Sequence, residues 1–136
     1  MPVRYEVDRS KRLISLTRQG AAEPTLSEFK LTVGEALATI RPERGFNYLV
    51  DGEVLVGTAV STGYLEELLS FLNSIEPCKV AVVARSPAAF GMARMAQTLS
   101  ERTMVRLKVF VAEVEAEEWL ALNDEDSGDN PRVGPT

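Results

Sequence analysis

The chain begins with alternating hydrophobic and polar residues and then changes to helical spacing. The alternation over residues 3–7 and 12–18, separated by a polar turn at 8–11, predicts an antiparallel hairpin. Thr25 is followed three positions later by Glu28, which is a capping-box pattern, and apolar residues at helical spacing come after it. A helix is therefore predicted over about 26–40.

Short apolar runs and helical stripes then alternate through the rest of the chain. The predicted strands are 46–50, 80–84 and 105–111, and the predicted helices are 62–76, a segment from 87 onward, and 114–122. Residues 52–60 are predicted to be a loop. The inward face of the helix after 87 is assigned to Met92, Met95, Ala96 and Leu99. The order ββαβαβαβα predicts an α/β fold: a five-stranded mixed, mostly parallel sheet with four helices.

Charge is distributed unevenly along the chain. Residues 113–136 hold eight acidic groups and one basic group, whereas residues 1–112 hold twelve acidic and fourteen basic groups. A nearly neutral body lacks the clustered cations that bind phosphate backbones, so we expect no nucleic-acid partner. We expect one domain over 1–122 and a disordered acidic tail over 123–136, because that tail has four acidic groups and almost nothing apolar.

Composition also excludes several kinds of chemistry. The chain has no histidine and a single cysteine, Cys78, so histidine-based triads, thiolate zinc sites and internal disulfides are ruled out. We expect no cofactor and no metal. No apolar run approaches the ~20 residues of a membrane span, and the N-terminus has no signal-peptide pattern. A cytoplasmic location is expected.

Several stretches resemble the STAS domains and the SpoIIAA-like proteins. They are residues 46–51 (FNYLVD), 79–84 (KVAVVA), 89–95 (AFGMARM), 109–111 (VFV) and 118–120 (EWL). The chain is most similar to a bacterial STAS-like branch related to the CRAL-TRIO lipid-binding fold. This resemblance covers residues 3–122 and implies a SpoIIAA-like fold.

The resemblance also implies a candidate phosphorylation site. In anti-sigma-factor antagonists of this fold, an acidic residue precedes a Ser-Ser-Gly or Ser-Thr-Gly helix start whose serine is phosphorylated by a partner kinase. Here Ser61 and Thr62 are followed by Gly63 at a similar distance beyond Asp51, but Val60 stands in the acidic position. Because of this departure, the phospho-switch is not part of the main hypothesis.

The candidate binding residues are expected near the carboxyl ends of the parallel strands, where ligands of open α/β sheets bind. They are Asp51, Ser61, Thr62, Tyr64, Arg85, Ser86, Phe90 and Arg94. For Ser61 and Ser86, simple helix capping is the alternative explanation. Gly91 inside a helix costs about 1 kcal/mol relative to alanine, which predicts the close approach of a neighbouring backbone or ligand.

Three functions remain open from the sequence. The first is a non-enzymatic interaction or regulatory module that docks through the second and third helices and the loop before Ser61. The second is a domain that binds a small hydrophobic ligand or lipid, suggested by the apolar content of residues 54–60. The third is an enzyme using Asp51, Glu53, Ser61, Arg85 and Arg94, whose spacing matches no known catalytic arrangement. The partner protein is unknown, and a homodimer stays an open alternative.

Overall fold

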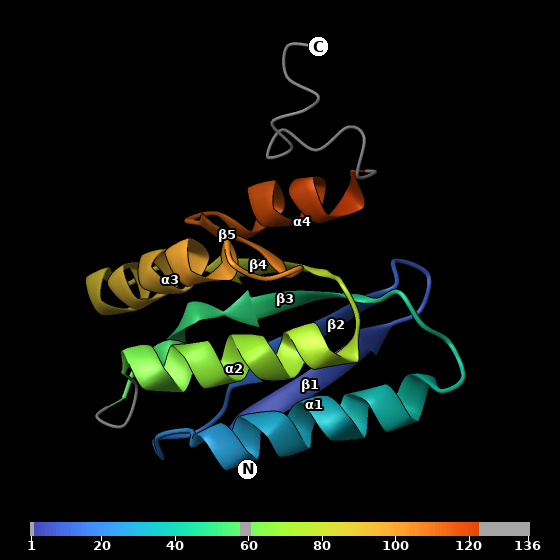
Figure 1. Ribbon diagram of the computed structural model, residues 1–136, viewed down its shortest axis with the longest axis horizontal. Helices are drawn as coiled ribbons and strands as arrows, with labels where there is room; N and C mark the ends of the chain where they lie inside the picture. The colour runs from blue at the N-terminus through green and yellow to red at the C-terminus, as the bar shows by residue number, and fades with distance from the viewer. Residues whose placement is uncertain (1, 58–60, 123–136) are drawn as a thin grey trace, which may run out of the picture.

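The computed structural model describes residues 2–57 and 61–122 (Figure 1). Within them the chain forms β1 (Val3–Asp8), β2 (Leu13–Arg18), α1 (Leu26–Ile40), β3 (Asn47–Asp51), the short 3-10 helix η1 (Gly52–Leu55), α2 (Thr62–Ile75), β4 (Lys79–Val83), α3 (Pro87–Ser100), β5 (Arg106–Phe110) and α4 (Glu113–Ala121). The predicted fold class and element order are confirmed. The predicted tail lies outside the described residues.

The described strands form one sheet in the order β1-β2-β3-β4-β5. β1 and β2 are antiparallel, and each later strand is parallel to the one before it. Two rows of aligned residues on one face are entirely apolar: Tyr5, Leu16, Val50, Val82 and Val109 form the first, and Val7, Ile14, Tyr48, Val80 and Leu107 the second. We call this the inner face.

The helices divide unequally between the two faces of the sheet. Buried side chains of α1, α2 and α3 pack together with the inner face in the main core. On the outer face, α4 packs through Trp119 and Leu120 onto Ala81 and Val83 of β4. Figure 1 shows α4 separated by the sheet from α1 and α2. Since β4 is covered on both faces, its continuous apolar run is explained.

Lys79 anchors α4 to the sheet. Its side chain is buried, with only 2% of the residue exposed, and its Nζ donates hydrogen bonds to the backbone oxygens of Trp119 and Leu122. Nζ also lies 5.3 Å from the centroid of the Trp119 ring. A cation is favoured at these carbonyls because the helix dipole is negative there. The Trp119 oxygen also accepts a hydrogen bond from the Leu122 N–H at 3.2 Å.

Helices also cover both edge strands of the sheet. Thr32 of α1 donates a long hydrogen bond of 3.5 Å to the backbone oxygen of Val3 in β1. On the other side, the Gln97 side chain of α3 accepts a hydrogen bond of 3.1 Å from the backbone N–H of Val109 in β5. An exposed strand edge invites pairing with another chain, so these contacts protect the sheet.

Two predictions about local structure are wrong. Gly52–Leu55, predicted as part of a loop, is a 3-10 helix that buries Val54 and Leu55. Met95, assigned to the inward face of the third helix, is 39% exposed, because α3 instead buries Ala89, Ala93, Ala96 and Ser100. These small residues let α3 lie close to the sheet, and the larger side chains of Met92 and Leu99 pack at the margin of the core.

We predict that Gly52→Ala lowers the free energy of unfolding by about 1–3 kcal/mol, the usual cost of overpacking. A Cβ at position 52 would lie 3.0 Å from the Val83 oxygen and 3.1 Å from the Ala84 Cα, where β3 and β4 end side by side. Urea denaturation followed by circular dichroism measures the change.

Gly91→Ala is the matched control, because nothing lies within 4 Å of its added Cβ. It should instead stabilise the helix by about 0.5–1 kcal/mol, so equal effects of the two variants would contradict this account.

We also predict that Lys79→Met lowers the free energy of unfolding by about 2–3 kcal/mol, because two carbonyls at the end of α4 lose a charged donor. Trp119 is the one tryptophan of the chain, so its fluorescence should shift to longer wavelength as α4 loosens. Lys30→Met is the control, because Lys30 pairs with exposed Glu67 at the surface and should change stability by less than about 1 kcal/mol. An unshifted Trp119 emission in Lys79→Met would show that this anchor does not hold α4.

Candidate functional site

The carboxyl edge of the sheet, where β2 to β5 end, is also where α2, α3 and α4 begin. Ser61 and Ser86 are the N-cap residues of α2 and α3, so both lie at this edge as predicted. Their hydroxyls accept hydrogen bonds from the backbone N–H groups of Tyr64 and Ala89, at 3.3 and 3.1 Å. The capping explanation therefore accounts for the position of both serines.

Ser86 has a second bond that joins two segments. Its hydroxyl donates to Oε2 of Glu53 at 2.8 Å, which links the start of α3 to η1. Asp51 caps η1, because its Oδ1 accepts a hydrogen bond from the Glu53 N–H at 3.0 Å. The two carboxylates that an enzyme would use as acid or base are thus both hydrogen-bonded within the scaffold.

Arg18, a residue without a predicted role, holds this region together. Its guanidinium lies at the end of β2 and donates to the backbone oxygens of Glu53, Val56 and Ala21, at 3.4, 3.3 and 3.3 Å. Because one guanidinium binds three backbone oxygens from two loops, it orients η1 against the hairpin. The sequence carries no signal for this role, because all three acceptors are backbone atoms.

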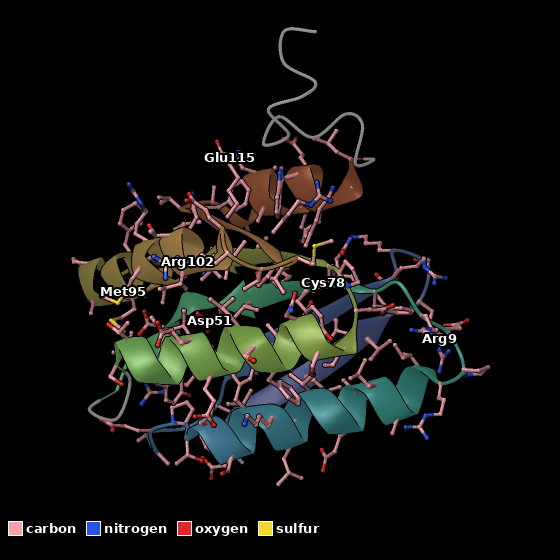
Figure 2. All side chains as sticks on the ribbon, in the orientation of Figure 1. Arg9, Asp51, Cys78, Met95, Arg102 and Glu115 are labelled. Carbon is pink, nitrogen blue, oxygen red and sulfur yellow. The ribbon has the colours of Figure 1, made fainter. Side chains whose placement is uncertain are left out.

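The other candidate residues make contacts that are separate from one another. Thr62 donates from its hydroxyl to the Met95 sulfur at 3.4 Å, which brings α2 against α3 (Figure 2). Arg85 pairs with Glu113 at 3.5 Å, and the Arg94 guanidinium lies 5.8 Å from the centroid of the Phe90 ring. Neither contact includes Ser61 or Ser86. The structure therefore distributes the predicted residues without gathering them around one point.

The surroundings of Tyr64 and Gly91 differ from those expected. Tyr64 is only 8% exposed, and its hydroxyl has no hydrogen-bond partner among the described residues. Burial, followed by the nearby Glu28 charge, raises the pKa of that hydroxyl. Gly91 is exposed, and a Cβ added there would have nothing within 4 Å, so the predicted close approach is wrong. The close approach occurs instead at Gly52.

Space inside the core is small. The enclosed apolar cavity between the inner face and α1 and α2 measures about 20 Å³ and is lined by Leu16, Phe29, Tyr48, Val50, Leu55 and neighbouring side chains. Binding sites for small molecules usually occupy about 300–1,000 Å³. The cavity gives no support to the lipid-binding alternative.

Cys78 is also buried, and this burial raises the pKa of its thiol to about 12.

A surface groove lies between α2 and α3, and we call it the α2–α3 seam. Its volume is about 250 Å³, and its lining consists of Glu66, Leu69, Ser70, Asn73, Leu99, Arg102 and Thr103. Met95 does not line the groove but lies just beyond one end of it, one helical turn before Leu99 and next to Thr62, and is 39% exposed. Met104 lies at the other end, where its N–H donates to Asn73 Oδ1 at 2.8 Å, and is 65% exposed.

The seam also carries charge of both signs. Glu66 lies on the α2 side and Arg102 just beyond the end of α3. Within the described ranges, neither side chain makes an ion pair. The sequence did not reveal the seam, because Met95 and Leu99 have the spacing of ordinary core positions. Their exposure depends on how closely α2 approaches α3.

Comparisons with family models, with curated proteins and with solved structures found no match to the chain. The STAS resemblance therefore stays a prediction. No helix in the described ranges has both the length and the apolar character needed to cross a membrane.

We predict that Ser86→Ala lowers the free energy of unfolding by about 1–2 kcal/mol, because it removes both a cap and a bond to a carboxylate. Ser61→Ala, which removes only an exposed cap, should cost about 0.5–1 kcal/mol. The difference should vanish when both serine variants are repeated in a Glu53→Ala background, measured by urea denaturation. An undiminished cost of Ser86→Ala in that background would show that the bond to Glu53 contributes nothing.

Proposed function

We propose that the protein is a non-enzymatic, cytoplasmic interaction module of the STAS type that docks a partner protein along the α2–α3 seam. The observation that carries the proposal is a groove with an apolar floor that has an exposed methionine, Met95 or Met104, just beyond each end of its lining. Methionine side chains adapt to different partner surfaces and are common where proteins dock. Contiguous exposed apolar surface with a polar rim marks such sites, whereas single exposed apolar residues do not.

The chemistry of the seam suggests what the partner offers. Leu69 and Leu99 provide an apolar floor, and Glu66 and Arg102 provide opposite charges beside it. A partner segment with apolar side chains between a basic and an acidic residue would match both the apolar floor and the two charges. Charges at the rim of an interface select the partner and its orientation more than they add affinity.

The contacts at the carboxyl edge favour a binding role over catalysis. Asp51 and Glu53 serve as hydrogen-bond acceptors for the local backbone and for Ser86. The Cys78 thiol is buried, and a pKa of about 12 makes it a poor nucleophile at neutral pH. Asp51 and Glu53 thus stabilise η1 and link it to the start of α3.

We predict that Met95→Glu and Met104→Glu each reduce recovery of the partner at least tenfold in affinity capture from the native cell, quantified by mass spectrometry. A charge introduced at either end of the seam would have to be desolvated on binding. Val114→Glu is the matched control, since Val114 is 67% exposed on α4 at the opposite face of the sheet. If all three variants recover the same proteins in the same amounts, the seam is not the docking surface.

A further inference from the structure

The outer edge of β1 keeps backbone hydrogen-bonding groups that the sheet does not use. In an antiparallel pair of strands, every second residue exchanges hydrogen bonds with the partner strand. The Gln19 N–H donates to the Pro2 oxygen at 2.8 Å, and the register continues from there along β1, so its even-numbered residues bond to β2. The N–H and C=O groups of Val3, Tyr5 and Val7 therefore point away from β2.

Helix α1 lies beside β1 but covers this edge at one end only (Figure 1). Val3 is 2% exposed, and its oxygen accepts the long bond from Thr32. Tyr5 and Val7 are half-buried, and no bond from a helix or loop in the described ranges reaches their backbone groups. The edge of β1 is therefore open from Tyr5 onward.

A groove of about 980 Å³ extends along the open part of this edge. Its lining includes every residue from Tyr5 to Arg9, together with Thr39 of α1 and with Ser15 and Leu49 on the outer face of the sheet. Successive side chains of a strand point to opposite faces, so a groove that contacts consecutive residues must reach the edge of the strand. A second backbone thus has room to approach the free N–H and C=O groups.

The charged side chains of this groove are mainly acidic. Its carboxylates belong to Glu6, Asp8, Glu113 and Glu117, and its cations to Arg9 and Lys11. The Arg9 guanidinium bonds Glu43 at 3.0 Å and the Thr39 backbone oxygen at 2.7 Å, so it is held away from the groove carboxylates. Hydrogen bonds from the Ser10 hydroxyl and the Lys11 N–H lower the pKa of Asp8, which keeps this carboxylate charged at neutral pH.

We propose that the open edge of β1 binds an extended segment of a partner protein as an additional strand, with basic residues at every second position and apolar residues between them. The basic side chains lie beside Glu6 and Asp8 on the outer face, and the apolar ones beside Tyr5 and Val7 on the inner face. In such strand addition, backbone hydrogen bonds supply the affinity, and the alternating side chains select the sequence. Opposite charges on neighbouring strands stabilise their pairing. The groove shares no residue with the α2–α3 seam.

The test is an NMR titration of the isotope-labelled full chain with the peptide acetyl-Lys-Val-Lys-Val-Lys-Val-amide. We expect the amide protons of Tyr5 and Val7 to shift downfield because they gain hydrogen bonds, whereas the Glu6 amide, which already bonds to β2, should shift less. Glu6→Gln combined with Asp8→Asn should weaken the affinity for the peptide by at least about fivefold. Glu67→Gln combined with Glu101→Gln removes the same charge outside the groove and should change the affinity by less than about twofold.

A second peptide separates strand addition from charge attraction alone. Acetyl-Lys-Lys-Lys-Val-Val-Val-amide has the same composition and charge, but it cannot place lysines on one face and valines on the other, so it should bind at least about fivefold more weakly. Equal affinity for the two peptides, no binding of the alternating peptide at millimolar concentration, or an undiminished affinity in the Glu6 and Asp8 variant would overturn the proposal. So would a dimer of the chain alone in sedimentation equilibrium with the Tyr5 and Val7 amides protected from exchange, because a second copy would then occupy the edge.

Discussion

The sequential order of the strands is the constraint on which the rest of this fold depends. After the first hairpin, every connection moves one strand further in the same direction. Connections between parallel strands are right-handed, so crossover helices that all step the same way are placed on the same face of the sheet. That is why α1, α2 and α3 share the inner face, and why α4, which is not a crossover, covers β4 from the outside.

The same constraint changes where recognition can occur. Ligands of open α/β sheets bind where successive crossovers turn in opposite directions and leave a crevice between them. The described sheet has no such reversal, and at its carboxyl edge Ser86 and Asp51 form hydrogen bonds with η1. Three helices in one layer instead create seams between neighbours, and the seam between α2 and α3 keeps two methionines exposed. This geometry favours a docking surface over an enclosed pocket.

The two ends of the molecule differ in chemistry as well as in shape. At the carboxyl edge, polar side chains satisfy backbone groups, and Arg18 is occupied by three carbonyl oxygens. At the amino edge, ion pairs connect neighbouring segments, as between Arg9 and Glu43 and between Arg44 and Glu76. Lys79 connects the sheet to α4 there, since it fixes the end of α4 beside the start of β4.

The sequence by itself determined the strands, the α-helices, their order and the caps at Thr25, Ser61 and Ser86, but not the 3-10 helix η1. Hydrophobic period and capping depend on neighbours a few residues away, so a local pattern specifies them. Only the tertiary structure decided which glycine is constrained, since Gly52 meets β4 while Gly91 meets nothing within 4 Å. It likewise decided that Met95 is exposed and that Lys79 is buried. These outcomes depend on segments distant in the chain, whose approach no local pattern specifies. Spacing along a helix gives the relative direction of its side chains, but the packing partner decides which direction faces the core.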